Sequence, residues 1–404
     1  MRKSRNYSNF SVCLVIFHPF PEIKGGEERF LKNFSAFLGN RNISFTIVSS
    51  IPRSKNMHIF GVGIKSFALP LLGLTPYSLL FSFIALMRII SLNKHRSFSL
   101  IHSIDTGYAG LAGLLASKIL RIKFLVHSHC SRAPLLKSIL LLRCGIVKYF
   151  IPPYEKFETY IDKIVSRNAD LVITVSNEIG EYICGLGVPS KKIVTIPMGI
   201  SASSFELKLK DREEVRCELG IRRTAFVIGY IGRIDSPSKR VDTLLRAFSV
   251  IHTKPCTNSF LVVVGDDVNG NLENRVRSMG VQSVILTGFR KDVKRILAGL
   301  DVFVLPSLSE GCPFSLLEAM AGGKAIVASD IPSIREIVED GKEALLFNPR
   351  EVNALVRALS RLCNNEDLRN ALGKSARKKV LQYKEETGLC KIADIYKQFK
   401  GIEI

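Results

Sequence analysis

Short apolar segments alternate with helical segments twice along this chain, and no other feature constrains the fold as strongly. Apolar runs of strand length lie at 11–17, 45–49, 99–102, 123–127 and 170–175, and again at 225–231, 259–264, 283–286, 301–305 and 325–328. Helical patterns follow most of them, for instance Glu27–Leu38, Ala109–Ile119, Val241–Ile251 and Ser315–Ala321. Near-continuous apolar strands joined by helices are typical of parallel sheets covered on both faces. The sequence therefore predicts an α/β chain with two doubly wound, Rossmann-like domains.

The alternation breaks near 197–224, where Pro197, Gly199 and the charged segment 208–216 interrupt it. We place an N-terminal domain at 1–200, a second domain at 201–380, and a C-terminal helix at 381–404 that we expect to pack back on the first domain. In doubly wound sheets, ligands bind beyond the carboxyl ends of the strands. The loops that follow strands are therefore the places to search for chemistry.

Positive charge is concentrated in the first half of the chain. The 404 residues carry 57 Lys and Arg against 36 Asp and Glu, a net charge of +21. Residues 1–200 hold 25 basic and 10 acidic residues, a net +15, whereas residues 201–404 hold 32 and 26, a net +6. Such an excess attracts nucleic acid, an acidic membrane surface or a phosphorylated substrate. The absence of Trp, of zinc-ligand spacing and of a basic motif interleaved with aromatics argues against nucleic acid.

Cysteine usage and apolar segments bear on the compartment. The nine cysteines are scattered and form no C-x-x-C, so we expect no disulfide framework, no zinc site and a reducing compartment. The basic N-terminus precedes an apolar run at 12–17 that is too short for a signal peptide, which favours a buried first strand. Residues 66–87 carry no charge, but prolines interrupt them. We expect an amphipathic or buried helix from about Pro76, with a surface-lying membrane helix and a true span as alternatives.

Two loops carry groups suited to an anionic ligand. Gly25 and Gly26 follow the first predicted strand and open a helix, where the backbone can approach an anion closely, although a plain turn has the same pattern. Arg233 and Lys239 lie on a Pro-containing loop after the strand at 225–231. Two fixed cations on one loop suit a diphosphate, although two solvated surface cations are as good an explanation for this pair alone.

A third loop, after the strand at 301–305, carries Glu310, and Glu318 lies eight positions later in the next helix. Carboxylates at such positions accept hydrogen bonds from sugar or ribose hydroxyls. Either Glu also fits a charge at a helix end, but an unpaired charge in the apolar helix around Glu318 is costly. The amides of Phe314, Ser315 and Leu316 lie near the helix start, where they can point at a phosphate or sugar oxygen.

The run from Ser307 to Asn348 closely resembles the donor half of glycosyltransferases with the two-Rossmann GT-B fold, in particular the retaining family 4 (glycosyl transferases group 1). Glu310 and Glu318 match the paired-glutamate motif of that group, and Arg233 and Lys239 match its phosphate-binding Arg and Lys. The resemblance extends to its nucleotide-side loops at Gly265, Asp266 and Phe289, to its glycine loop at Gly25 and Gly26, and to the single His after a strand, which we align with His129. The chain departs from the group at Arg240 and Met198, where a glycine and an asparagine are usual.

The resemblance implies two domains facing each other across a cleft and transfer of a hexose from a nucleotide-sugar to an acceptor hydroxyl, with retained anomeric configuration. Arg233 and Lys239, helped by the amides of Gly25 and Gly26, would stabilise the departing diphosphate, which itself takes the acceptor proton. Glu318 would hold the donor ribose, Glu310 the sugar hydroxyls, and His129 would line the cleft from the acceptor side.

His102 and His127 are weaker candidates, and we expect His127 to be buried and directed away from His129. No Asp-x-Asp occurs, and this fold class needs none, so we expect no bound metal and no cofactor besides the nucleotide-sugar substrate.

Two alternatives stay open: a nucleotide-sugar epimerase or phosphorylase of the same fold, and a non-catalytic basic membrane-binding protein. With donor chemistry in the second half, the excess positive charge falls on the acceptor domain. We therefore expect a glycan or lipid-linked acceptor, an anionic membrane surface as partner, and no nucleic acid. This places the chain in polysaccharide or glycolipid biosynthesis in the cytoplasm, peripherally attached to the cytoplasmic face of the membrane.

Overall fold

The computed structural model describes residues 10–17, 25–50, 59–61, 76–130, 147–234, 237–267, 270–281 and 283–399. The chain forms two compact units, 1–197 with 387–404 (unit 1) and 198–386 (unit 2). The N-terminal residues 1–9, Lys24 and the portion 66–75 of the uncharged stretch lie outside the described residues.

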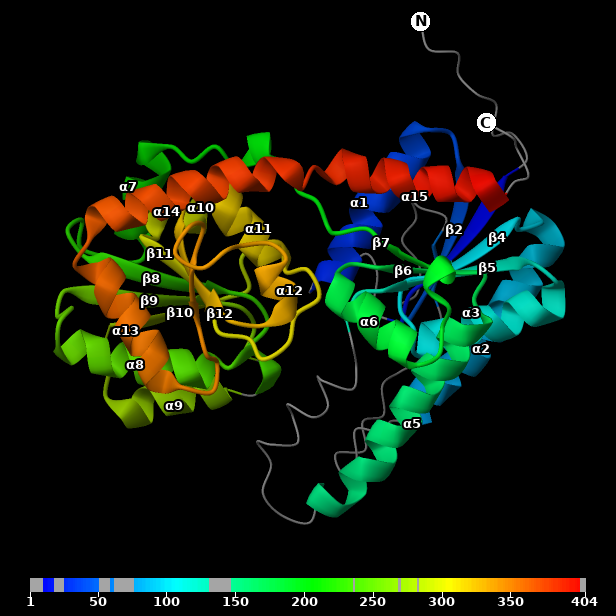
Figure 1. Ribbon diagram of the computed structural model, residues 1–404, viewed down its shortest axis with the longest axis horizontal. Helices are drawn as coiled ribbons and strands as arrows, with labels where there is room; N and C mark the ends of the chain where they lie inside the picture. The colour runs from blue at the N-terminus through cyan, green and yellow to red at the C-terminus, as the bar shows by residue number, and fades with distance from the viewer. Residues whose placement is uncertain are drawn as a thin grey trace, which may run out of the picture. The chain divides into compact units, whose positions relative to one another are not determined.

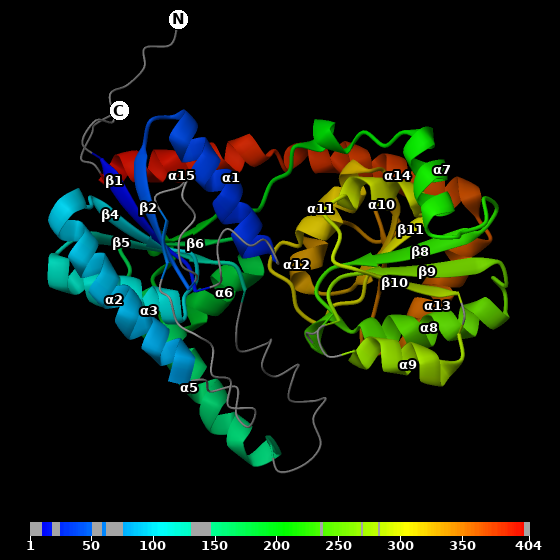
Figure 2. The same cartoon turned by 180° about the vertical axis from the view of Figure 1, so that it is seen from behind.

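Unit 1 is built on a seven-stranded parallel sheet of order β3-β2-β1-β4-β5-β6-β7 (Figures 1 and 2). The strands are β1 (Ser11–Val15), β2 (Ser44–Ser49), β3 (Ile59–Gly61), β4 (Leu100–Ser103), β5 (Lys123–Ser128), β6 (Leu171–Thr174) and β7 (Ile193–Thr195). The five strands predicted in this half are confirmed. The edge strands β3 and β7 were missed because three residues are too few to show a periodic pattern.

Helices cover both faces of this sheet. They are α1 (Gly26–Asn40), α2 (Pro76–Arg96), α3 (Tyr108–Leu120), α5 (Val147–Asn168), α6 (Asn177–Gly185) and α15 (Glu385–Phe399), with a short 3-10 turn at Ser190–Lys192. On one face, the Ser103 hydroxyl donates to the Ala109 carbonyl of α3, and the Ser82 hydroxyl of α2 donates to Tyr108. On the other face, Tyr396 of α15 packs with Phe34 of α1 against the sheet.

Unit 2 is built on a six-stranded parallel sheet of order β10-β9-β8-β11-β12-β13. The strands are β8 (Phe226–Ile231), β9 (Ser259–Val264), β10 (Val284–Gly288), β11 (Val302–Leu305), β12 (Ala325–Ser329) and β13 (Leu345–Phe347). The five strands predicted here are also confirmed, and only the short edge strand β13 was missed. A buried apolar cluster that includes Ile228, Phe248, Val263 and Leu355 forms the core on one face.

The helices of unit 2 are α7 (Leu209–Glu218), α8 (Val241–Thr253), α9 (Asn271–Met279), α10 (Val293–Gly299), α11 (Phe314–Ala321), α12 (Pro332–Arg335), α13 (Val352–Cys363) and α14 (Glu366–Lys379), with 3-10 turns at Ala202–Phe205, Pro237–Lys239 and Val380–Gln382. Helices α8, α9 and α13 cover one face of the sheet, and α7, α10, α11 and α14 cover the other (Figures 1 and 2). Both sheets are thus doubly wound, as predicted.

A buried ion pair fastens α7 to the sheet. Asp301 accepts hydrogen bonds from Arg212 and Arg216, each at 2.8 Å, and from the Val227 amide at 2.7 Å. The Arg216 guanidinium also donates to three backbone carbonyls, so that four of its five N–H groups are hydrogen-bonded. Because Arg216 is buried, this carboxylate is its required counterion.

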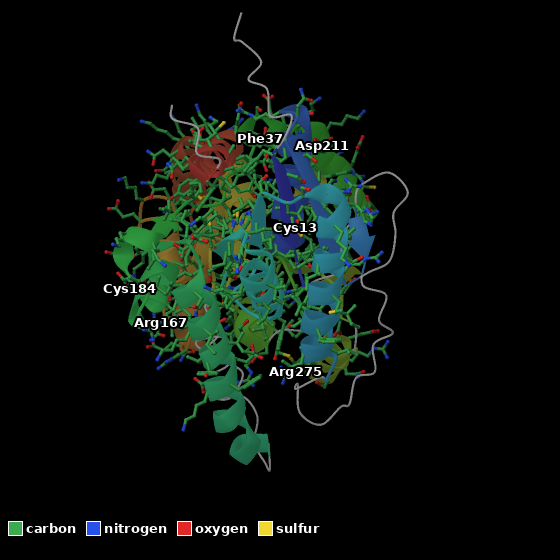
Figure 3. The ribbon with its side chains drawn as sticks, turned by 90° about the vertical axis from the view of Figure 1, so that its right-hand side faces the viewer. Cys13, Phe37, Arg167, Cys184, Asp211 and Arg275 are labelled. Atoms are coloured by element: carbon green, nitrogen blue, oxygen red, sulfur yellow. A yellow bond between two sulfur atoms is a disulfide. The ribbon has the colours of Figure 1, made fainter. Side chains whose placement is uncertain are left out.

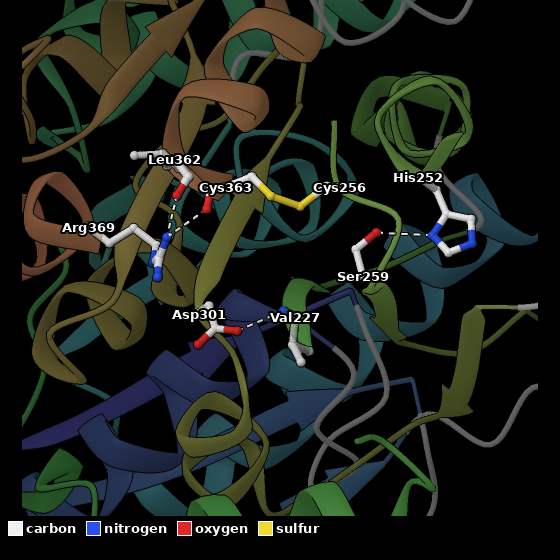
Figure 4. The surroundings of a disulfide bond; sticks show 8 residues. All are labelled: Val227, His252, Cys256, Ser259, Asp301, Leu362, Cys363 and Arg369. Atoms are coloured by element: carbon white, nitrogen blue, oxygen red, sulfur yellow. Dashed lines mark hydrogen bonds between the residues drawn. A yellow bond between two sulfur atoms is a disulfide. The ribbon is translucent and has the colours of Figure 1, made fainter. Parts of the chain in front are cut away.

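One disulfide corrects the expectation drawn from the scattered cysteines. Cys256, between α8 and β9, is bonded to Cys363 at the end of α13, with 6.5 Å between their Cα atoms (Figure 4). The two cysteines are 107 residues apart, so their spacing gave no sign that the fold brings them together. Other cysteines are free, among them the buried Cys13 of β1 and the exposed Cys184 of α6 (Figure 3).

Helix α2 begins at Pro76, as the sequence predicts, and one side of it faces solvent. Among the helices of the described chain, none combines the length and apolar character needed to cross a bilayer.

Candidate functional site

Three of the predicted site residues lie at one edge of the sheet of unit 2, at the carboxyl ends of its central strands β8 and β11. The Lys239 ammonium lies 2.7 Å from a carboxylate oxygen of Glu310, although the two residues are 71 positions apart in sequence. Glu310 follows β11, and Lys239 and the exposed Arg233 follow β8. The pair is largely shielded from water, since the Glu310 side chain is 8% exposed and that of Lys239 is 18% exposed.

Backbone hydrogen bonds hold these loops in place. The Leu308 amide donates to the carbonyl of the buried Ser238 at 2.7 Å, which joins the loop after β11 to the loop after β8. The Tyr230 hydroxyl donates to the Arg233 carbonyl at 2.7 Å. Arg233 is therefore fixed at its backbone, while its guanidinium extends into solvent.

Gly265 lets the loop after β9 approach the loop after β8. Its φ is +153°, and a Cβ at this position would lie 2.1 Å from the Gly232 carbonyl oxygen. The Gly265 amide also donates to the Gly288 carbonyl at the end of β10. The exposed side chains of Asp266 and Phe289 follow directly, so both lie at the same edge of the sheet as Arg233.

Helix α11 begins just after the Glu310 loop and carries the second glutamate. Glu318 is buried within this helix. The Leu316 amide donates to the Pro313 carbonyl at 3.1 Å and is engaged in the first turn, so Phe314 and Ser315 are the positions whose amides begin the helix. The paired glutamates thus belong to one loop–helix segment beside the two cations.

In unit 1, His129 follows β5 and lies against α1. Its ring centroid is 5.1 Å from that of Phe30, and its Nε2 is buried without a hydrogen-bond partner among the described residues. Burial lowers the pKa of His129 to about 3, so the ring is neutral at pH 7. A neutral imidazole can accept a hydrogen bond from a hydroxyl through one nitrogen and donate through the other.

The expectation that His127 points away from His129 is wrong, although its burial is confirmed. The two rings stack with centroids 4.2 Å apart, because residues two apart in an extended strand project to the same face. Burial lowers the pKa of His127, and it lowers the pKa of His102 to about 3. His102 Nδ1 lies 2.6 Å from the Tyr396 hydroxyl oxygen, so this histidine holds α15 against the sheet.

The glycine loop of unit 1 faces a carboxylate that the sequence analysis missed. Helix α1 begins at Gly26, and a Cβ at Gly25 would lie 2.9 Å from an oxygen of the buried Glu28. Two acidic residues, Glu27 and Glu28, occupy the first turn and compensate the helix dipole there. The phosphate role of the Gly25 and Gly26 amides stays a prediction, and the acidic pair is part of the surroundings in which it would act.

Within the described ranges, no group of three or more His, Cys, Asp or Glu side chains is arranged to hold a metal ion. The expectation of metal-free chemistry stays a prediction.

Two family models match successive parts of the chain. The model described as Glycosyltransferase Family 4 matches residues 24–204, and the one described as Glycosyl transferases group 1 matches residues 225–365. Together they span most of both units.

Individual relatives agree with these matches. The UDP-Gal:alpha-D-GlcNAc-diphosphoundecaprenol alpha-1,3-galactosyltransferase of Escherichia coli is 26% identical over 320 residues, which cover 77% of this chain and 78% of the relative. The N,N'-diacetylbacillosaminyl-diphospho-undecaprenol alpha-1,3-N-acetylgalactosaminyltransferase of Campylobacter jejuni is 29% identical over 227 residues, 55% of this chain and 59% of the relative.

Among solved structures, sucrose-phosphate synthase from Thermosynechococcus elongatus superposes with a TM-score of 0.82 at 19% identity, covering 97% of this chain and 99% of that one. At this identity the likeness shows the fold. Sequence motifs, family models and fold agree, and the chain belongs to the family 4, group 1 glycosyltransferases of GT-B fold.

Proposed function

We propose that this glycosyltransferase moves a hexosyl group from a nucleoside diphosphate sugar to an acceptor hydroxyl with retention of the anomeric configuration. The observation that carries the proposal is the arrangement at the carboxyl ends of β8 and β11, where Lys239 is paired with Glu310 and the exposed Arg233 lies on the same loop as Lys239. A leaving diphosphate needs cations, and a sugar needs hydrogen-bond acceptors. This edge of the sheet offers both.

In the proposed reaction, the bond between the anomeric carbon and the β-phosphate oxygen breaks, and the nucleoside diphosphate leaves with the electron pair. The acceptor oxygen bonds to the same face of the anomeric carbon, and its proton passes to the departing phosphate. Arg233 and Lys239 stabilise the developing phosphate charge. Glu310 orients the sugar hydroxyls, and Glu318 holds the ribose.

The test is turnover with UDP-, GDP- and ADP-hexoses, followed by NMR of the product's anomeric proton. We expect nucleoside diphosphate release to require an added acceptor, and the product to keep the donor's α or β configuration. Release without an acceptor hydroxyl, or conversion of the free nucleotide-sugar, would favour an epimerase or a hydrolytic side reaction. An inverted product would refute retention. Glu310→Gln and Arg233→Ala should each lower kcat/KM by at least 100-fold, and Glu213→Gln, an exposed substitution on α7, should not.

We further propose that the acceptor is linked to a lipid diphosphate. The named relatives from E. coli and C. jejuni act on diphosphoundecaprenol-linked sugars. The positive excess of residues 1–200 suits an acceptor that carries negative charge at its lipid end. The assay compares an undecaprenyl-diphosphate-linked sugar with the same free sugar, and equal kcat/KM for both would contradict the proposal.

We also propose that unit 1 docks on an anionic membrane surface, and that the enzyme works on the cytoplasmic face. Four side chains of α2 form an apolar stripe and are 45–60% exposed, namely Leu79, Leu80, Phe83 and Met87. Their spacing of about four residues places them on one side of the helix. The neighbouring α3 adds Leu115 and Ile119.

Cations lie next to the apolar stripe. The last turn of α2 holds Lys94 and Arg96, and the exposed Lys118 lies on α3. Apolar side chains beside cations are the arrangement that places a helix in the interface of an anionic bilayer, with each cation adding about 1 kcal/mol. A surface of this kind fits a lipid-linked acceptor better than a soluble one.

Flotation with vesicles containing phosphatidylglycerol tests the docking surface. Leu80→Ser with Phe83→Ser should reduce bound protein at least tenfold, whereas the matched pair Leu209→Ser with Val250→Ser, at exposed apolar sites of unit 2, should bind as the parent does. Raising salt from about 0.1 to 0.5 M should weaken binding by screening the cations. Equal flotation of both double variants would overturn the proposal.

A further inference from the structure

Arg240 holds an unusual backbone conformation directly beside the Lys239–Glu310 pair. Its φ is +52° and its ψ is 35°, in the left-handed region that glycine adopts freely and arginine does not. The group that the chain resembles usually has a glycine at this position. The backbone here is one that suits glycine, yet it carries a guanidinium.

Among the described residues, the Arg240 side chain has no hydrogen-bond or ion-pair partner that explains it. Its Nε is buried without a hydrogen bond, and across the described ranges no carboxylate forms an ion pair with its guanidinium. The buried Arg216 differs, because Asp301 and three carbonyls accept hydrogen bonds from four of its five N–H groups, its Nε among them. A half-buried guanidinium with an unfilled donor is positioned for an acceptor that comes from outside the chain.

The charge balance of the loop indicates what that acceptor is. Lys239 is paired with Glu310 at 2.7 Å, so these two side chains together contribute no net charge. Of the two cations assigned to the diphosphate, Arg233 is the one for which the described part of the chain supplies no counterion. A nucleoside diphosphate carries two to three negative charges when it leaves, so one uncompensated cation neutralises it poorly. Arg240 supplies a second uncompensated cation one residue from Lys239.

We propose that Arg240 is a third phosphate-binding cation, which contacts the terminal phosphate of a nucleoside diphosphate. The proposal rests on the donor site proposed above. A guanidinium in this place binds phosphate oxygens in a fork, which an ammonium cannot do. It accounts for both the unfilled Nε and the need for a cation beside the paired Lys239.

The test uses the full chain and measures the affinities of UDP, GDP and ADP, and of the matching monophosphates, by isothermal titration. Arg240→Gly suits the backbone and removes only the side chain, so Tm should not fall below that of the parent. The Kd of the best-binding diphosphate should rise tenfold to a hundredfold, as for loss of a charge-assisted hydrogen bond. The Kd of its monophosphate should change less than threefold. Arg240→Lys should recover part of the affinity, and Arg246→Gly, at an exposed site on α8, should leave binding unchanged.

Three results would overturn the inference: unchanged diphosphate affinity in Arg240→Gly, equal losses for diphosphate and monophosphate, or equal losses in Arg246→Gly. Arg240→Asn, which also tolerates left-handed backbone, repeats the test if the glycine variant does not fold. Two more variants, Arg233→Ala and Lys239→Ala, test the donor site separately from the role of Arg240. If neither weakens diphosphate binding, the donor site itself is wrong; if both do and Arg240→Gly does not, only the role of Arg240 is wrong.

Discussion

Gly265→Ala is expected to disrupt the donor site through its backbone. The added Cβ would lie 2.1 Å from the Gly232 carbonyl oxygen, about 0.9 Å inside the 3.0 Å limit for such contacts. This oxygen belongs to backbone and cannot swing aside, since the Gly232 amide is hydrogen-bonded to Val264 at 3.0 Å. A φ of +153° costs an L-residue about 1–2 kcal/mol, and forced separation of the strands adds about 1–3 kcal/mol. We therefore expect a total loss of about 2–5 kcal/mol.

Urea denaturation measures the loss in free energy of unfolding, and titration with the best-binding nucleoside diphosphate measures the site. Because Gly232 directly precedes Arg233, moving its carbonyl should also weaken diphosphate binding at least tenfold. The matched control is Gly288→Ala, where φ is +69° and no atom lies within 4 Å of the new Cβ. The control should lose only the backbone term of about 1–2 kcal/mol and keep its affinity. If the two variants lose equal stability and bind alike, the close approach of the two loops is not what holds the site.

Three further predictions concern stability. Asp301→Ala should lower the free energy of unfolding, measured in urea, by about 3–5 kcal/mol, because it leaves the buried Arg216 guanidinium without its counterion. As a control, loss of the exposed Glu213–Arg223 pair should cost under about 1 kcal/mol. Burial lowers the pKa of His102 and of His129 to about 3 and also lowers that of His127, so the unfolded chain takes up as many as three more protons below pH 6.5. Stability should then fall as the pH drops from about 6.5 toward 3, by up to about 1.4 kcal/mol per pH unit for each histidine, and an unchanged slope in His127→Phe would contradict this. Dithiothreitol should lower the free energy of unfolding by about 2–4 kcal/mol by opening the Cys256–Cys363 bond, and it should have no effect on the variant with serine at both positions.

The sequence alone determined the doubly wound plan. Ten of the strands were placed within about two residues of their observed bounds, because strands buried on both faces read as continuous apolar runs. The loops after β8 and β11 were found in the same way, since parallel strands bring their following loops to one edge of the sheet. The motif around Glu310 and Glu318 then predicted the family.

Only the tertiary structure decided which of these groups meet and what surrounds them. Three contacts join residues that are far apart in the sequence. They are the ion pair of Lys239 with Glu310, 71 positions apart, the disulfide of Cys256 with Cys363, 107 apart, and the contact of His102 with Tyr396, 294 apart. Hydrophobic periodicity carries information about a few turns of chain, whereas these contacts depend on strand order and on how each helix crosses the sheet. For the same reason, the chain shows an arginine at position 240, but only the fold shows its left-handed backbone and its unfilled donor beside a neutralised lysine.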